Sequence, residues 1–275
     1  MKKKKGPVSE HYRDGGPSTD WYDLYGQWGP GTPCDGDISF YLRHAREVGG
    51  PVLELAAGTG RVALEIAGAG FDVVGLDRSP DMLRQARAKA RARIARSGSA
   101  GSASFVRGDM ARFDLGRRFG VIIIAFRSFQ HLLTPAAQRS CLLCARRHLR
   151  KGGRLLIQLF DPRLDLLLPG RHATGMERAG ILDPESGHTL DLVVTGRRSD
   201  PLAQTFEETW SWTERDAAGT LVRECSDLLR LRWIYRHEMA YLLELAGFRV
   251  RASYSDFKRG RPRYGAEQIW VAERP

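Results

Sequence analysis

A glycine turn and an aspartate stand at the ends of two consecutive apolar runs. The first run, Val52–Ala56, leads into the turn AGTGR, and the second, Asp72–Leu76, is followed at once by Asp77. Glycines in such a turn can adopt positive φ and let a ligand pass close to the backbone. Amides at a helix start favour a negative group such as a carboxylate. Because Asp77 offers acceptors to the two hydroxyls of a ribose, the pattern predicts an adenosine ligand with a carboxylate-bearing tail.

Two kinds of adenosine cofactor fit this outline. A nicotinamide dinucleotide normally needs G-x-G-x-x-G, in which the third glycine allows close packing of the helix on the strand. This sequence has Gly58 and Gly60, with Ala63 where the third glycine or alanine falls. Glu54, inside the strand before the turn, would repel a pyrophosphate and attract an ammonium group. The sequence therefore disfavours the dinucleotide, although Ala63 keeps that alternative open.

Three motifs in order, ELAAGTGR, VVGLDRSPDML and RGDM, resemble the class I S-adenosylmethionine-dependent methyltransferases. The resemblance covers most of the chain, from Asp37–Leu42 to the last residues. It implies S-adenosyl-L-methionine as the cofactor and a small molecule as the methyl acceptor, since small-molecule enzymes of this kind carry an antiparallel platform where this chain has an insertion. Together the three motifs are specific, whereas any one of them alone would be weak.

The resemblance implies a role for each matching position. Glu54 would lie near the methionyl ammonium, residues 56–60 would wrap the methionyl chain, and Asp77 would hold the ribose hydroxyls. The predicted cofactor-binding residues are Tyr22, Tyr25, Glu54, Ala56, Ala57, Gly58, Thr59, Gly60, Arg61, Asp77, Arg78, Met82, Gly108, Asp109, Met110 and Phe126. Core packing remains the alternative for Met82, Met110 and Phe126, and a strand-edge charge for Glu54.

Methyl transfer from a sulfonium is an in-line displacement with a good leaving group. The protein mainly aligns the donor and the acceptor and excludes water, and a base is needed only if the acceptor arrives protonated. The candidate catalytic residues, Arg127 and His131, follow the predicted fourth strand in AFRSFQHLL. Arg127 would grip an anionic substrate or the cofactor carboxylate, and His131 would accept a proton. The alternative for His131 is a histidine that a neighbouring backbone group satisfies.

Apolar runs and helical patterns alternate over residues 50–160, which predicts a parallel sheet covered on both faces. The predicted fold class is α/β, Rossmann-like and doubly wound, with a mostly parallel seven-stranded sheet and an inserted antiparallel β meander. The expected domains are an N-terminal lid or helical segment (1–50), a cofactor-binding α/β domain (51–163 and 234–275) and the insertion (164–233). The expected strands and helices of the α/β domain are Val52–Ala56, Arg61–Ala69, Asp72–Leu76, Pro80–Ala95, Ser104–Arg107, Gly120–Phe126, Pro135–Leu149, Arg154–Phe160, Arg236–Ala246, Phe248–Tyr254 and Glu267–Ala272.

Aromatic residues gather in two places outside the α/β core. The segment Trp21–Trp28 is similar to lids that fold over the cofactor, which would bring Tyr22 or Tyr25 near the methionyl carboxylate; packing of an N-terminal helix is the alternative. In the insertion, Trp210 and Trp212 alternate along a predicted strand and share one face. We expect the inserted strands to form the acceptor pocket or the contact of a homodimer.

Charge and composition limit the remaining alternatives. A net charge of +11 suggests nucleic-acid binding, but four of the charges are Lys2–Lys5 and many others are arginines spread along helices. RNA methylation therefore stays open as an alternative, and nucleic acid is not the expected partner. The chain has no apolar run near the roughly 18 residues of a membrane span and no secretory signal pattern, so a cytoplasmic location is expected. Of the four cysteines, Cys141 and Cys144 share one helix face, which favours a core position over metal binding, and no metal site is predicted.

Overall fold

The chain divides into two compact units. The computed structural model describes residues 8–12, 14–26, 29–97, 101–167 and 177–275. The first unit joins Met1–Gly26 to Arg163–Arg232, and the second joins Gln27–Pro162 to Trp233–Pro275. The predicted insertion thus falls within the first unit, and the predicted N-terminal segment 1–50 is divided between the two.

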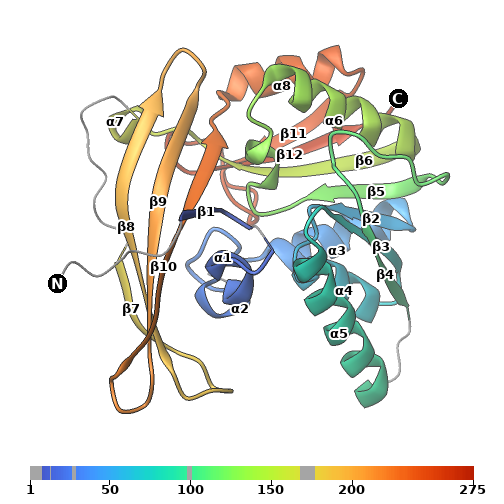
Figure 1. Cartoon of the computed structure of the whole chain (residues 1–275). Coiled ribbons are helices and arrows are strands. Elements are labelled where there is room, and N and C mark those ends of the chain that lie inside the picture. The colour runs from blue at the N-terminus through green and yellow to red at the C-terminus, as the bar shows by residue number, and fades with distance from the viewer. Residues whose placement is uncertain (1–7, 13, 27–28, 98–100, 168–176) are drawn as a thin grey trace. The chain divides into compact units, whose positions relative to one another are not determined.

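The second unit contains a seven-stranded, mostly parallel sheet (Figure 1). In spatial order the strands are β11 (Arg249–Tyr254), β12 (Glu267–Glu273), β6 (Leu149–Phe160), β5 (Phe119–Ile124), β2 (Val52–Leu55), β3 (Asp72–Asp77) and β4 (Ser102–Arg107). The pairs from β6 to β4 are parallel, and β12 runs antiparallel to both of its neighbours. Strand order reverses between β2 and β5, which is where open α/β sheets bind ligands. The predicted fold class is confirmed.

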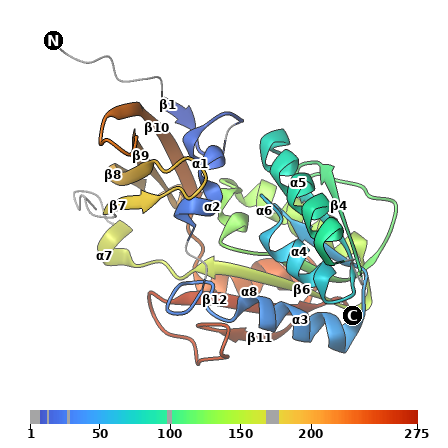
Figure 2. The same ribbon diagram turned by 90° about the horizontal axis from the view of Figure 1, so that it is seen from below.

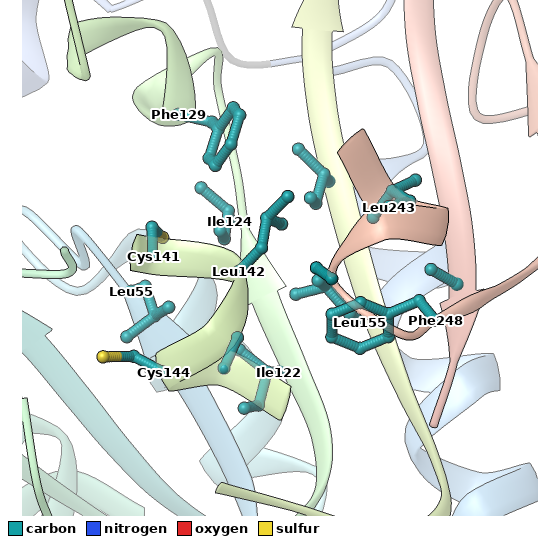
Figure 3. Packing of buried hydrophobic residues seen from close by; sticks show 14 of the residues in the cluster. Leu55, Ile122, Ile124, Phe129, Cys141, Leu142, Cys144, Leu155, Leu243 and Phe248 are labelled. Carbon is teal, nitrogen blue, oxygen red and sulfur yellow. The ribbon is translucent and has the colours of Figure 1, made fainter. Parts of the chain in front are cut away.

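Helices cover both faces of this sheet. They are α3 (Asp37–Val48), α4 (Arg61–Gly68), α5 (Pro80–Ser97), α6 (Pro135–His148) and α8 (Arg236–Leu245), with the 3-10 helix η1 (Ser128–His131). Alternate residues of β5 belong to different cores, because successive side chains of a strand point to opposite faces. Ile122 and Ile124 pack with residues of α6 and α8 (Figure 3), whereas Val121 and Ile123 pack with residues of α3, α4 and α5.

Cys141 and Cys144 lie in the first of these cores, as Figure 3 shows. Both thiols are buried, and burial raises the pKa of Cys141 well above its usual value. Among the described residues, no group of histidine, cysteine and carboxylate side chains could hold a metal ion. The two cysteines therefore fill space in the core, as their helical spacing predicts.

The first unit contains a five-stranded sheet, seen from another side in Figure 2. Its order is β1 (Val8–Glu10), β10 (Leu221–Arg232), β9 (Thr205–Arg215), β8 (Thr189–Asp200) and β7 (Glu177–Leu182). β7 to β10 form an antiparallel meander, as predicted, while β1 pairs in parallel with β10. The described residues of this unit also form short helices: α1 (Pro17–Asp20), α2 (Tyr22–Tyr25) and α7 (Leu164–Leu167).

The predicted elements of the second unit agree with the observed ones except at their ends. Ser79 caps α5, since its Oγ accepts a hydrogen bond from the Met82 amide at 3.2 Å, and Pro80 occupies the first helical position. The fourth strand was expected to reach Phe126 but ends at Ile124. No helix in the described parts of the chain combines the length and the apolar character that a membrane crossing needs.

Phe105 of β4 packs against two glycines near the turn that follows β2. A Cβ atom at Gly75 would lie 2.6 Å from Phe105 Cδ1 and 3.0 Å from Ala57 Cβ. A Cβ atom at Gly60 would lie 2.9 Å from Phe105 Cζ. Gly75 and Gly60 therefore make room for the ring, which fills the space beside the turn.

We expect Gly75→Ala to lower the free energy of unfolding by about 1–3 kcal/mol, because the added methyl overpacks the space that Phe105 fills. Urea denaturation followed by circular dichroism would measure this. Gly196→Ala in β8 is the matched control, since a Cβ atom there would meet nothing within 4 Å. Equal stabilities of Gly75→Ala and wild type would contradict the role given to Phe105.

Candidate functional site

The turn between β2 and α4 has a backbone that suits close approach by a ligand. Ala56, Gly58 and Gly60 adopt left-handed φ values of 56°, 54° and 83°. The Gly60 amide donates to the Ala57 carbonyl at 2.9 Å, and Thr59 is fully buried. A left-handed alanine is strained, because its Cβ crowds the following carbonyl, and strain of this kind gathers at functional sites.

Asp77, the last residue of β3, joins this turn to the neighbouring strand. Its Oδ2 accepts a hydrogen bond from the Gly58 amide at 2.8 Å, and its Oδ1 accepts one from the Ser79 amide at 2.9 Å. Burial raises the pKa of Asp77, and these amides oppose the rise. The Arg78 amide acts in the same direction. An ionised carboxylate has about four acceptor positions, so these amides leave acceptor capacity for a ligand hydroxyl.

Glu54 lies inside β2 and is buried. Its Oε2 accepts a hydrogen bond from the Ala63 amide, in the first turn of α4, at 2.8 Å. Burial raises the pKa of Glu54 to about 8, although Arg61 and the Ala63 amide act in the opposite direction. A carboxyl group in this position is suited to a cationic ligand, because a nearby positive charge would favour its ionised form.

Arg61, the first residue of α4, is held by the start of α3. Its Nη2 lies 2.5 Å from Asp37 Oδ2 and 3.7 Å from Cys34 Sγ. Asp37 is buried, and its other oxygen accepts a hydrogen bond from the Ile38 amide at 2.7 Å. The predicted cofactor contact of Arg61 would therefore form beside an existing ion pair.

The residues that follow β3 and β4 were predicted to border an adenine. Met82 is buried in α5, whereas the Arg78 side chain is exposed. The Gly108 amide donates to the Asp77 carbonyl at 2.9 Å, which ties the end of β4 to the end of β3. Asp109 is exposed and accepts a hydrogen bond from the Ala111 amide at 2.8 Å, and Met110 packs partly against the core.

Phe126 and Arg127 form a strained turn after β5. Both residues have left-handed φ values, 46° and 63°. The Phe126 amide donates to Gln158 Oε1 at 2.9 Å, and Gln158 Nε2 donates to Glu267 Oε2 at 3.2 Å. Arg127 Nη2 lies 2.5 Å from Glu267 Oε1. A network from β6 and β12 thus holds the turn, and Arg127 would have to share or leave Glu267 to grip an anion.

His131 ends the 3-10 helix η1 and is half-buried. Its predicted role as a base stays a prediction, as does ligand contact for Phe126, which packs partly against the core.

Tyr22 and Tyr25 belong to the first unit, in α2. Tyr25 is buried against Trp212, with ring centroids 4.9 Å apart, and Tyr22 lies edge-on to Tyr25 at 5.9 Å. Contact of either tyrosine with the cofactor stays a prediction.

The structure therefore brings half of the predicted cofactor residues together within the second unit. Ala56 to Gly60 and Asp77 meet through the hydrogen bonds described above, and Glu54 contacts the start of α4. Gly108 joins them through the carbonyl of Asp77. Asp77, at the end of β3, offers an acceptor for hydroxyls, and Glu54, in the adjacent strand β2, offers a buried carboxyl group for a cation.

Sequence reasoning missed three residues that support these turns: Asp37, Gln158 and Glu267. Gln158 interrupts the apolar run LLIQLF of β6, which was a signal of a buried polar role. Glu267 begins β12 and contacts Arg127, 140 positions away in the sequence. No local pattern indicates such a partner.

Comparisons with known proteins agree with this geometry. Residues 52–153 match the family described as "Methyltransferase domain". A glycine/sarcosine N-methyltransferase of Parasynechococcus marenigrum (strain WH8102) is 30% identical over 166 residues, which is 59% of this chain and 55% of that protein. The chain spans about half the length of the curated relatives it matches.

Two solved structures are similar over most of the chain. The CcbJ methyltransferase from Streptomyces caelestis has a TM-score of 0.71 and 28% identity, covering 96% of this chain and 98% of its own. The amino pentose methyltransferase CalS10 from Micromonospora echinaspora, solved with bound S-adenosylmethionine, has a TM-score of 0.62 and 27% identity, covering 87% and 89%.

We expect Glu54→Gln to stabilise the unliganded protein, increasingly so as pH rises. The folded-state pKa of Glu54, about 8, exceeds its ordinary value of 4.5, so the folded state binds the proton more tightly. The contribution of protonated Glu54 to the free energy of unfolding is therefore fully present below about pH 4.5 and is lost as pH rises towards 8. The difference in the free energy of unfolding between Glu54→Gln and wild type should grow by up to about 1.4 kcal/mol per pH unit between pH 5.5 and 7.5.

Urea denaturation of both proteins across this range would test the expectation. Other titrating groups are common to the two proteins, so the difference between them isolates Glu54. A difference that stays constant with pH would show that Glu54 titrates as it does in the unfolded chain.

Proposed function

We propose that this chain, which carries a class I S-adenosylmethionine-dependent methyltransferase domain, transfers the methyl group of S-adenosyl-L-methionine to an amine nitrogen of a small molecule. The proposal rests above all on one observation. Asp77 and Glu54 present carboxyl groups at adjacent strands, on either side of a turn whose backbone a ligand can approach.

S-adenosyl-L-methionine matches the chemistry of both positions. Its ribose hydroxyls would donate to the free acceptor positions of Asp77, and its ammonium group would lie near Glu54, directly or through water. The methionyl chain would run along residues 56–60. A dinucleotide would instead place a pyrophosphate near Glu54, where its charge would be repelled.

The choice of an amine acceptor is supported by what the similar proteins act on. One is a glycine/sarcosine N-methyltransferase and another methylates an amino pentose. The similar proteins named above give no support to an oxidoreductase function or to RNA methylation. Transfer to oxygen remains the second possibility within the same reaction class.

The reaction needs little covalent chemistry from the protein. S-adenosyl-L-methionine supplies an activated methyl group on its sulfonium, and the chain's residues orient the donor and the acceptor and exclude water. In this proposal Phe126 borders the reacting centre, and the network of Gln158 and Glu267 holds the turn that carries it. Arg127 and His131 stay candidates for binding an anionic group and accepting a proton.

The lid role of Tyr22 and Tyr25, a homodimer formed by the inserted strands and a cytoplasmic location all stay predictions.

Methyl transfer itself tests the proposal. Incubation with S-adenosyl-L-methionine labelled in its methyl group and a panel of amino sugars and small amino acids should give an acceptor that gains one labelled methyl group in mass spectra. Calorimetry should show binding of S-adenosyl-L-methionine and its demethylated product in preference to NAD. Preferential binding of NAD would overturn the proposal.

Asp77→Asn should weaken binding of S-adenosyl-L-methionine by about 1–3 kcal/mol, because a charge-assisted hydrogen bond is lost. Asp72→Asn is the matched control, since Asp72 lies at the opposite end of the same strand and pairs with Arg117. Calorimetric titration of both variants would measure the effect. If Asp77→Asn and Asp72→Asn bound S-adenosyl-L-methionine with equal affinity, Asp77 would not be a cofactor-binding residue.

Cofactor binding should release a proton between pH 5.5 and 7.5. Burial holds the pKa of Glu54 near 8, and the cofactor's ammonium group would lower it, so affinity should rise with pH in this range. Calorimetry in buffers with different ionisation enthalpies would count the proton. Glu54→Gln should abolish the release, and an unchanged proton count in that variant would show that the proton comes from another group.

A further inference from the structure

An arginine–glutamate pair lies at one edge of the seven-stranded sheet, within the second unit. Arg127 follows β5, and Glu267 begins β12, where it pairs with Phe160 at the end of β6. Arg127 Nη2 lies 2.5 Å from Glu267 Oε1, and Arg127 Nε donates to Glu267 Oε2 at 3.4 Å. The pair therefore joins the ends of β5, β6 and β12, on the side of β2 away from β3.

Burial divides the pair into an inner and an outer partner. The Glu267 side chain is 11% exposed, whereas that of Arg127 is 34% exposed. The Arg127 guanidinium also lies beside the Phe160 ring, with Cζ 5.7 Å from the ring centroid. Its contacts with Glu267 use two of the five N–H donors of a guanidinium. Arg127 can therefore receive a ligand on its exposed side without leaving Glu267.

Buried hydrogen bonds hold Glu267 in place behind Arg127. Gln158, fully buried in β6, donates from Nε2 to Glu267 Oε2 at 3.2 Å and to the Pro33 carbonyl at 2.9 Å. Its Oε1 accepts a hydrogen bond from the Phe126 amide at 2.9 Å, so Gln158 fixes both the pair and the turn that precedes it. An arginine that is already ordered loses little conformational freedom on binding, which favours affinity.

The pair lies close to the ion pair beside the cofactor turn. Arg61 Nη2, which pairs with Asp37, lies 3.7 Å from the Cys34 thiol. Burial raises the pKa of Cys34 to about 12, and the charges of both ion pairs also act on this pKa. Both pairs are therefore near one buried thiol, which places Arg127 in the neighbourhood of the cofactor turn within the same unit.

Four charged side chains at this edge, two arginines and two carboxylates, balance one another. Arg236 Nη2 lies 3.7 Å from Asp161 Oδ1 and donates to the Glu267 carbonyl at 3.3 Å. Arg127 and Arg236 thus offset Glu267 and Asp161. A phosphate dianion would find no excess of positive charge here, whereas a zwitterion brings no net charge of its own.

We propose that Arg127 binds the carboxylate of a zwitterionic methyl acceptor, an amino acid, with Glu267 and Gln158 as positioning residues. Arg127 Nη1 and Nη2 would donate to the two carboxylate oxygens, a planar match that favours a carboxylate. In the proposed function Phe126, directly before Arg127, borders the reacting centre, so the carboxylate and the nitrogen lie a few bonds apart. The inference names the acceptor class of the proposed function and rests on it.

Pairs of acceptors that differ only in the anionic group test the inference. Glycine, β-alanine and γ-aminobutyrate, each beside its carboxamide, are added to the labelled-methyl screen, and kcat and KM are measured for the full chain. At least one carboxylate should exceed its carboxamide in kcat/KM by about tenfold or more, because the amide loses the charge-assisted hydrogen bonds. Sodium acetate, unlike acetamide, should compete with that acceptor. Equal kcat/KM within every pair, or transfer to amino sugars but to no amino acid, would overturn the inference.

Variants locate the preference at the pair. Arg127→Gln should raise the KM of the carboxylate by about tenfold or more and leave that of the carboxamide nearly unchanged, while Arg127→Lys should keep part of the preference. Glu267→Gln should reduce the preference through a higher KM, with kcat kept. Arg117→Gln is the matched control, since Arg117 is an exposed arginine that pairs with Asp72 at the start of β3.

The folding of each variant and its binding of S-adenosyl-L-methionine are measured alongside. A preference for the carboxylate that survives in folded Arg127→Gln would assign it to another group and overturn the inference. The comparison of acceptors in the wild type needs no variant, so it holds even where a substitution disturbs the turn. Cofactor binding without transfer to any amine would instead count against the proposed function, so the two failures are distinguishable.

Discussion

The hydrogen bond from the Gly58 amide to Asp77 is the contact on which the arrangement of the predicted cofactor residues depends. It joins the turn after β2 to the end of β3, and it places an acceptor for hydroxyls directly beside a backbone that a ligand can approach. Behind the turn, Gly75 and Gly60 leave room for the ring of Phe105. The turn thus also depends on the packing of Phe105 against Gly75 and Gly60, three residues that lie behind it.

Several features of the second unit oppose stability while they suit ligand binding. Glu54 is buried where its charged form is disfavoured, and Ala56, Phe126 and Arg127 adopt left-handed conformations. All four lie within or just after β2 and β5, the neighbouring strands between which strand order reverses. A cation that binds near Glu54 would offset the free-energy cost of burying its charged form. The concentration of strain and buried charge at one sheet edge is itself evidence that a ligand completes the structure.

Features set by local sequence were predictable, and features set by distant contacts were not. The turn AGTGR, Ser79 as the cap of α5 and the alternating strands follow from residues a few positions apart. In contrast, Glu267 reaches Arg127 across 140 positions, and β1 pairs with β10 from the other end of the chain. A three-residue strand carries no periodic signal, so neither β1 nor the neighbourhood of His11 could be read from its own sequence.

The same division separates the predicted cofactor residues, which short motifs indicate, from the buried His11–Asp227 pair, which they do not. The hydrogen bonds that Gly58, Ser79 and Ala63 donate to Asp77 and Glu54 join neighbouring strands and turns, so short motifs record them. The His11–Asp227 pair instead depends on the pairing of β1 with β10 and on a tryptophan from β9. Asp227 stands out only in the tertiary structure, where its side chain is buried and its Oδ2 has no hydrogen-bond partner among the described residues.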